Sequence, residues 1–313
     1  MGAPEERGCG ISSNGATVVA LTLAQDLNPR VRANAVKIAV VGLLLVVVYL
    51  PAFSWLHEKY SEPDSYYSHG YLIPFVSAYV VWHKRRRLGG LPVAPSSAGL
   101  WVLAGGLVLY VLSRWWYVNF SAAFSIPIVL TGLSLYLLGR AATRELLLPL
   151  AYLLFAIPLP KIAIIYVTFW LKLLAASGAT EVVSWMGVPI LLQGAFIELP
   201  RAQLEVDNAC SGLRSLISLT ALGAIWAYFL PVSSRKKWMV VLLSVPLAWI
   251  ANLNRIVAVI LIKYLLEPSG RAFEMVDLAT GLSVFAMAAI GLYLISRAVI
   301  AWERLRPVPS KVA

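Results

Sequence analysis

Long apolar runs are the feature that most limits how this chain can fold. The first run, Val36 to Leu56, is long enough to cross the hydrocarbon core of a bilayer, and similar runs recur almost to the C-terminus. Of the 313 residues, 60% are hydrophobic and only 13% are charged, whereas about a quarter of the residues of a soluble domain are charged. The sequence therefore predicts an integral membrane protein.

The positive charges are concentrated in short segments between the apolar runs. A net charge of +11 could indicate a nucleic-acid partner, but this distribution is what membrane topology requires. The strongest basic cluster is His83–Arg87, and basic residues also precede the first run. We therefore expect the N-terminus and this cluster in the cytoplasm, the lipid bilayer as the surroundings, and no nucleic acid as a partner.

The alternation of apolar and basic segments predicts an all-α membrane protein with eight transmembrane helices and both termini inside. The expected spans are residues 36–56, 70–82, 98–113, 115–138, 145–157, 210–230, 238–264 and 278–300. Residues 1–35 are expected to form a flexible cytoplasmic tail without a cleavable signal peptide, because the first apolar run starts late. The membrane domain would then comprise residues 36–303, and residues 304–313 a basic cytoplasmic tail.

Two segments between the fifth and sixth expected spans differ from the rest. Residues 162–186 are apolar but carry Lys172 and Glu181 and are interrupted at Ser177–Gly178, so we expect interfacial or re-entrant helices there. Residues 187–206 predict a small extracytoplasmic hairpin, with strands 188–192 and 195–199 joined at Gln193–Gly194.

Cys210 follows this segment at the start of the sixth expected span. Asn208 is a favourable N-cap, which would place Cys210 in the first helical turn, where the helix dipole favours a thiolate. Arg214, four residues further, shares the same helix face and adds positive potential. The alternative is a small buried hydrophobic residue. The other cysteine, Cys9, is expected on the opposite side of the membrane, so no intrachain disulfide is expected.

Arg255 lies within the seventh expected span, roughly 25 Å from its inner end. It either extends to the outer headgroups or faces a polar cavity, and the neighbouring Asn252 and Asn254 favour a cavity. The topology puts Cys210, Arg255 and Asp277 at similar depth on consecutive helices. Such a set suits a cysteine nucleophile whose oxyanion is stabilised by a guanidinium. Two histidines, at positions 57 and 69, are also expected on the outer side.

Five segments of the chain resemble the exosortase/archaeosortase family of prokaryotic membrane cysteine transpeptidases. They are Tyr67–Pro74, Ala156–Pro160, Gly187–Pro189, Ala209–Ser215 and Ala251–Arg255, and they occur in the family's order. The Cys-Ser-Gly-Leu-Arg block followed by Asn-x-x-Arg is the specific part of the resemblance.

The resemblance implies a cysteine protease/transpeptidase in the bacterial inner membrane, with its active site facing the extracytoplasmic side. Its substrates would be membrane-anchored proteins with a C-terminal sorting signal, in which a short motif, often Pro-Glu-Pro, precedes a transmembrane helix and a basic tail. The enzyme would cut near the motif and pass the acyl group to an acceptor that the sequence does not identify.

Family catalysis rests on a cysteine, the arginine of Asn-x-x-Arg, and a histidine or arginine early in the last helix. Here Asp277 stands at that third position, and a carboxylate does not donate a proton at neutral pH unless its pKa is raised. Asp277 orients Arg255 while His69 transfers the proton, or the third role is absent or supplied elsewhere, or the chain is a non-catalytic relative. The expected catalytic residues are Cys210, Arg255, Asp277 and His69, and the expected substrate-binding residues are Arg214, Ser211, Asn252 and Asn254.

Other classes of function fit the residues less well. We expect no metal and no cofactor, because no ligand spacing and no glycine-rich phosphate loop is present. A non-enzymatic transporter or a scaffold for exopolysaccharide assembly is the main alternative, although we find no inverted repeat typical of transporters. A rhomboid-type serine protease lacks its serine motif and a histidine in a late span.

Overall fold

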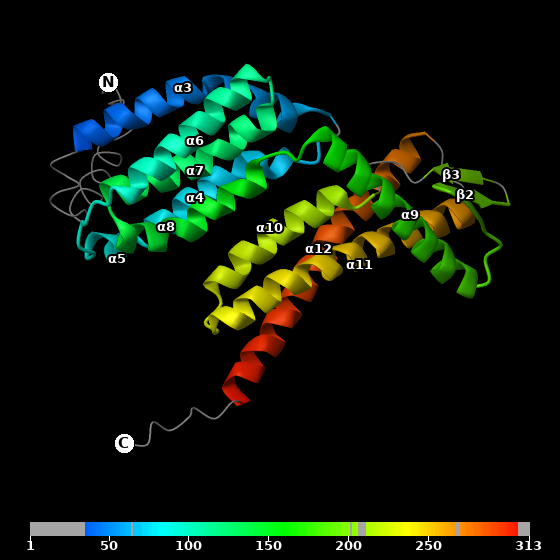
Figure 1. Ribbon diagram of the computed structural model, residues 1–313. Coiled ribbons are helices and arrows are strands. Elements are labelled where there is room, and N and C mark those ends of the chain that lie inside the picture. The colour runs from blue at the N-terminus through cyan, green and yellow to red at the C-terminus, as the bar shows by residue number, and fades with distance from the viewer. Residues whose placement is uncertain (1–34, 64, 201, 206–210, 267–269, 306–313) are drawn as a thin grey trace, which may run out of the picture. The chain divides into compact units, whose positions relative to one another are not determined.

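The computed structural model describes residues 35–63, 65–200, 202–205, 211–266 and 270–305, which are mainly helical (Figure 1). They divide into two compact units. The first comprises the described residues up to His57 together with Leu72–Leu154. The second comprises Glu58–Tyr71 and the described residues from Phe155 onward.

The helices follow one another closely in both units. Those of the first unit are α3 (Ala35–Ser61, whose last residues belong to the second unit), α4 (Leu72–His83), α5 (Arg85–Gly89), α6 (Ala98–Trp115), α7 (Asn119–Leu137) and α8 (Arg140–Tyr152). The short helix η2 (Leu153–Ala156) crosses the unit boundary. The second unit contains η1 (Ser68–Tyr71), α9 (Lys161–Trp185), β1 (Leu191–Gln193), β2 (Phe196–Leu199), β3 (Ala202–Glu205), α10 (Leu213–Phe229), α11 (Ser234–Leu266) and α12 (Arg271–Leu305).

The chain is a multi-pass membrane protein, but the predicted eight spans are not confirmed. Within the described residues, the helices long and apolar enough to cross a membrane are α3, α6, α7, α9, α11 and α12. Helices α4, α8 and α10 contain 12, 13 and 17 residues. Each is shorter than α6, which with 18 residues is the shortest of these candidate spans.

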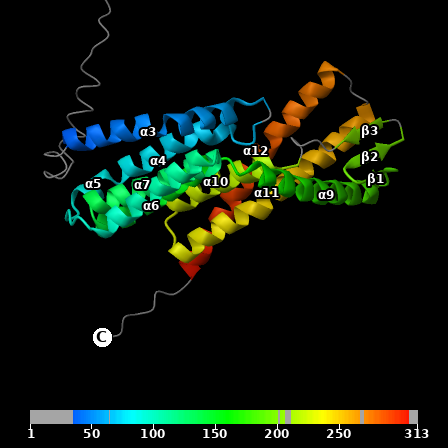
Figure 2. The ribbon, with the colours of Figure 1, turned by 45° about the horizontal axis from the view of Figure 1, so that its top comes forward.

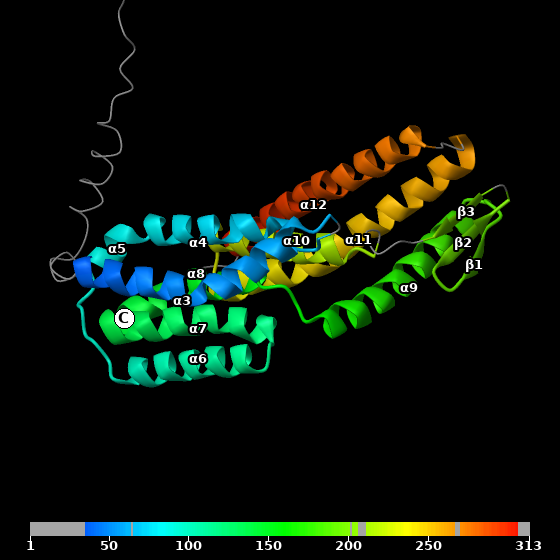
Figure 3. The ribbon, with the colours of Figure 1, turned by 90° about the horizontal axis from the view of Figure 1, so that it is seen from above.

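Close packing in the first unit depends on small residues. Helices α6 and α7 lie side by side (Figures 2 and 3), and Gly99 on α6 lies directly against the backbone of Tyr136. Gly132 on α7 makes the same kind of approach to the backbone of Leu103. A Cβ atom at either glycine would overlap the opposing helix. Such contacts between small residues are the usual way in which helices associate in lipid.

Helix α8 is joined to α4 by polar contacts around a proline. Pro149 lacks an N–H, so the carbonyl of Glu145, four residues earlier, loses its helical partner. The Nζ of Lys84 donates a hydrogen bond to that carbonyl at 2.8 Å and lies 3.1 Å from the Glu145 carboxylate. The Arg87 guanidinium lies 2.8 Å from the other carboxylate oxygen, and the hydroxyl of Ser77 donates to the Pro149 carbonyl at 2.7 Å. Lys84 therefore satisfies the carbonyl that the proline leaves without a partner.

Residues 162–186 were predicted to form interfacial or re-entrant helices with an interruption at Ser177–Gly178, and the predicted interruption is wrong. Helix α9 continues through Ser177 and Gly178 over 25 residues, and it meets the criteria for a membrane span. A Cβ at Gly178 would lie 3.1 Å from Leu253 of α11, and Ala175, Ala176 and Ala179 are buried nearby. The small residues therefore form a packing surface against α11 rather than an interruption of the helix.

The segment expected to form a two-stranded hairpin forms a three-stranded antiparallel sheet in the order β1-β2-β3. Gln193 pairs with Phe196 across a turn in which Gly194 has φ +65°. The strand β3, which the sequence did not predict, pairs Ala202 with Leu199. Ile197 of the sheet is buried with residues of α9 and α11, so the sheet closes the core of the second unit.

Candidate functional site

Helix α10 begins at Leu213, later than the sequence predicted. Gly212 occupies the N-cap with φ +83°, a left-handed conformation that favours glycine. The prediction that Asn208 caps this helix is therefore wrong, because the capping position is Gly212. Asn208 and Cys210 themselves lie outside the described residues, so the position of the predicted nucleophile is not part of the geometry below.

The residues that lead into α10 are held firmly against α11. Ser211 is 1% exposed, and its hydroxyl accepts a hydrogen bond from the N–H of Leu213 at 3.4 Å. A Cβ at Gly212 would lie 2.7 Å from the side-chain nitrogen of Asn252, which is 2% exposed. The hydroxyl of Ser215 donates to the Gly212 carbonyl at 2.9 Å. The chain therefore enters α10 in direct contact with the Asn-x-x-Arg segment of α11.

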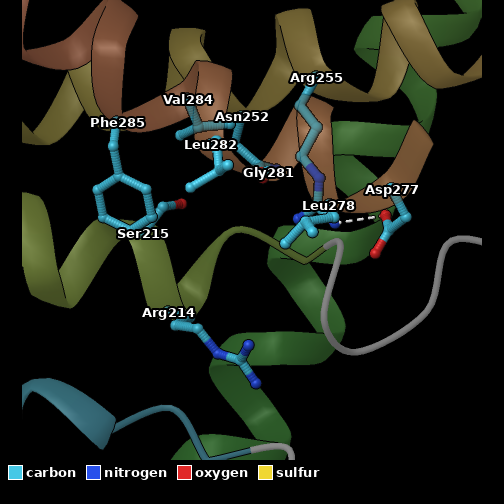
Figure 4. A pocket seen from close by; sticks show the side chains of 10 residues that line it. All are labelled: Arg214, Ser215, Asn252, Arg255, Asp277, Leu278, Gly281, Leu282, Val284 and Phe285. Carbon is cyan, nitrogen blue, oxygen red and sulfur yellow. Dashed lines mark hydrogen bonds and ion pairs between the residues drawn. The ribbon is translucent and has the colours of Figure 1, made fainter. Parts of the chain in front are cut away.

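Arg255 follows Asn252 by three residues, so the two lie on the same face of α11. Its Nη2 lies 2.7 Å from Oδ1 of Asp277 on α12, and Figure 4 shows the two side chains pointing toward one another. The Arg255 side chain is 12% exposed and that of Asp277 is 45% exposed. The predicted proximity of these two residues is confirmed.

The ion pair opens into a pocket of about 310 Å³ between α10, α11 and α12. The polar residues of the lining are Asn252, Arg255, Asp277, Arg214 and Ser215. The apolar part of the lining comes from α12 and consists of Leu278, Gly281, Leu282, Val284 and Phe285, which lie next to the polar side chains (Figure 4). A Cβ added at Gly281 would meet no atom within 4 Å, so this glycine leaves the pocket open. The pocket therefore offers a guanidinium beside an apolar wall.

Arg214 also lines the pocket, but it is directed away from the Arg255–Asp277 pair (Figure 4). Its Nε is buried and has no hydrogen-bond partner among the described residues. The two arginines therefore do not act on one point as a pair in this conformation.

His69, in η1, contacts α10 one turn beyond Arg214. The hydroxyl of Ser218 donates to the Arg214 carbonyl at 2.8 Å and lies 3.1 Å from Nδ1 of His69. Nε2 of the same ring is buried and has no hydrogen-bond partner in the described part of the chain.

Burial lowers the pKa of His69 below its usual 6.5, and a hydrogen bond with the backbone of Phe155 partly offsets this effect. The imidazole is therefore neutral at pH 7, which is the form that can accept a proton. His69 lies outside the candidate membrane spans.

Tyrosines connect η1 to the chain that precedes α9. The ring of Tyr67 stacks on that of His69 with centroids 5.9 Å apart, and its hydroxyl accepts a hydrogen bond from the N–H of Leu159 at 3.1 Å. The hydroxyl of Tyr60 donates to the Ala156 carbonyl at 2.5 Å. Gly70 packs directly on the ring of Tyr60. Tyr67, at the start of the segment Tyr67–Pro74, thus contacts the segment Ala156–Pro160 within the second unit.

The predicted site residues fall into separate groups. Arg214, Asn252, Arg255 and Asp277 share the pocket, Ser211 is a buried contact beside it, and His69 is connected to it through Ser218 and Arg214. Asn254 is exposed and does not line the pocket. Sequence reasoning missed Ser218 and Tyr67, although the spacing of Ser218 four residues after Arg214 could have placed it on that face. Within the described residues, no group of three His, Cys, Asp or Glu side chains could hold a metal ion.

Comparison with known proteins gives one match. The family model for transmembrane exosortases matches residues 55–294, which includes every described residue of the pocket. Neither the curated proteins nor the solved structures contain a match to the chain.

Proposed function

Because the chain belongs to the transmembrane exosortase family, we propose that it is a membrane-embedded cysteine protease/transpeptidase. It cleaves the C-terminal sorting signal of exported, membrane-anchored proteins on the extracytoplasmic side of the bacterial inner membrane. The acyl group of the substrate passes through a thioester on Cys210 to an acceptor amine, hydroxyl or water.

One observation carries this proposal. The segment Ser211–Gly212, which directly follows Cys210 in the sequence, packs on Asn252, and Arg255 of the same helix face opens into the pocket. A nucleophile and a guanidinium that belong to one catalytic unit need such a rigid connection, because small displacements of reacting groups reduce the rate strongly.

The chemistry proceeds in two stages. The Cys210 thiolate forms a bond to the substrate carbonyl carbon, and the π electrons move to the carbonyl oxygen. The Arg255 guanidinium stabilises that oxyanion with its charge and its directed N–H groups. The oxyanion then collapses, the C–N bond breaks, and the amine leaves with a proton. The acceptor attacks the thioester in the same way and releases Cys210.

Asp277 acts through Arg255. A carboxylate near a cysteine opposes thiolate formation, but an ion pair at 2.7 Å offsets that charge. The carboxylate also restricts the orientation of the guanidinium, so Asp277 is a positioning residue rather than a proton donor. The site supplies neither a histidine nor an arginine at this position of the last helix, so another group has to move the proton.

His69 is the group that we assign to proton transfer. Its Nδ1 is hydrogen-bonded with Ser218, and its Nε2 has no hydrogen-bond partner among the described residues. Its neutral form at pH 7 can take the proton of the thiol or of the incoming acceptor.

A matched pair of cysteine variants tests the proposal. The client is a tagged host protein that ends in a short motif, an apolar helix and a basic tail, and the measurement is mass spectrometry of its C-terminus. Cys210→Ala should abolish cleavage, and Cys9→Ala, the control, should leave it unchanged. Full processing by Cys210→Ala would instead support a non-enzymatic transporter or a scaffold for exopolysaccharide assembly.

A further inference from the structure

A second pocket lies in the first unit and shares no residue with the site described above. It has a volume of about 420 Å³ and is lined by Leu135, Arg140, Ala141, Thr143, Arg144 and Leu147. Ligand pockets in proteins typically measure roughly 300–1,000 Å³. The pocket is therefore large enough for a small polar group and part of an apolar chain.

The two arginines that line this pocket have no counter-charge among the described residues. Arg140 and Arg144 are four residues apart, so they share one face of α8, and both are exposed. Neither has a hydrogen bond or an ion pair within the described part of the chain. Like charges at this spacing repel each other, so an anion between them would stabilise the helix.

The one carboxylate on α8 does not supply that anion. Both oxygens of Glu145 are already engaged, at 3.1 Å by Lys84 and at 2.8 Å by Arg87. Arg140 and Arg144 therefore keep an uncompensated positive charge in the lining of the pocket.

The rest of the lining is apolar except for Thr143, whose hydroxyl donates to the Gly139 carbonyl. Leu135 and Leu147 border the arginines, and Leu147 is among the exposed apolar residues of α8. A soluble phosphate would gain nothing from these side chains, whereas the first part of an acyl chain would bury against them. Basic clusters of this kind mark the cytoplasmic side of a membrane protein, where anionic lipids are concentrated.

We propose that this pocket binds the phosphate of an anionic phospholipid. The phosphate lies between the guanidiniums of Arg140 and Arg144, which suit phosphate oxygens because each can donate two parallel N–H bonds. The glycerol and the adjoining part of the acyl chain lie against Leu135 and Leu147. The bound lipid offsets the repulsion between the arginines.

Native mass spectrometry of the full chain in detergent, with dioleoylphosphatidylglycerol added, tests the site. Arg140→Gln/Arg144→Gln should bind this lipid about 30-fold more weakly than the unaltered chain. The control is Arg86→Gln/Arg297→Gln, which removes the same charge from positions outside the pocket and should change binding by less than about threefold. Equal losses in the two double variants would overturn the proposal, because binding would then depend on net charge alone.

Two further measurements test whether lipid binding requires the pocket and an acyl chain in addition to the two arginines. Ala141→Trp keeps both arginines but fills the pocket, so it should weaken lipid binding at unchanged thermal unfolding temperature; unchanged binding would overturn the proposal. Dioleoylphosphatidylcholine and inorganic phosphate should each bind more weakly than dioleoylphosphatidylglycerol. Inorganic phosphate that binds as tightly as the lipid would show a soluble anion site instead.

Discussion

The two units contain acid–base contacts of similar length that are used differently. In the first unit, the carboxylate of Glu145 lies 3.1 Å from Lys84 and 2.8 Å from Arg87, and Lys84 also satisfies a backbone carbonyl. In the second unit, Arg255 and Asp277 lie 2.7 Å apart and line a pocket. The contacts in the first unit satisfy a carbonyl of a proline-containing helix, whereas the contact in the second unit leaves the Arg255 guanidinium in the lining of a pocket.

The exposure of the carboxylates also differs. Glu145 is 18% exposed, and its partners Lys84 and Arg87 are 14% and 71% exposed, whereas Asp277 is 45% exposed and its partner Arg255 is 12% exposed. An ion pair with an exposed partner contributes little to stability. The Arg255–Asp277 pair is therefore better explained by function than by folding, and the following variants test that difference.

The largest effect is expected from Arg255→Ala. Removing one donor from an oxyanion site typically lowers the rate about 10²- to 10³-fold, so client cleavage should fall by that amount. Thermal unfolding should change little, because the remaining Asp277 carboxylate can be hydrated. Arg255→Lys is the matched control: it keeps the charge without the fork of N–H groups and should recover only part of the rate. Cleavage within threefold of the unaltered chain would contradict this role.

Glu145→Gln should have the opposite profile. It removes the charge that compensates Lys84 and Arg87, and the loss of a buried charged hydrogen-bond partner costs about 1–3 kcal/mol. The unfolding midpoint in denaturant should fall, while client cleavage per folded molecule should stay unchanged. If cleavage falls and the midpoint does not, the contrast between the two units is wrong.

Asp277→Asn should lower the cleavage rate less than Arg255→Ala does. Asparagine can still accept a hydrogen bond from Arg255 but no longer offsets its charge, so the guanidinium is less well oriented. We expect about a tenfold loss of cleavage, within the range of positioning effects, and no measurable change in stability. A loss as large as that of Arg255→Ala would assign Asp277 a direct part in the chemistry.

The smallest effect concerns the pH dependence of stability at His69. Burial lowers the pKa of this histidine below 6.5, so the unfolded chain binds the proton more readily than the folded chain. Above pH 6.5 the histidine is neutral in both states and does not lower the free energy of unfolding. As the pH falls from 6.5 toward the folded-state pKa, the unfolded chain binds the proton first, so the free energy of unfolding decreases. Unfolding midpoints measured across this range should decline for the unaltered chain and decline less for His69→Gln. Equal slopes would show that the His69 environment does not set the dependence.

The arrangement of the pocket was largely predictable from sequence. Arg255 and Asp277 are near the same ends of two consecutive apolar runs that pass in opposite directions, and this alone brings them together. The contact of His69 with Ser218 was not predictable, because 149 residues separate the two and neither belongs to a periodic pattern that indicates the other.

Other departures have packing as their cause. Ser177–Gly178 suggested a break in α9, but Gly178 contacts Leu253 and the helix is continuous. Glycine has a low helix propensity, so it suggests a break in a helix when the sequence is considered alone. In a membrane protein the missing side chain also allows a neighbouring helix to approach closely. The sequence analysis also did not identify Gly212 as the N-cap of α10. Gly212 contacts Asn252 of α11, and a contact with another helix leaves no local sequence signal.

The open carbonyl before Pro149 has a consequence for how the protein is made. A helix that carries an unmatched carbonyl and a carboxylate is poorly soluble in hydrocarbon by itself. Its partner Lys84 precedes Glu145 by 61 residues, so the ribosome synthesises the lysine before α8. We therefore expect α8 to pack against the segment that contains Lys84 as soon as α8 is synthesised.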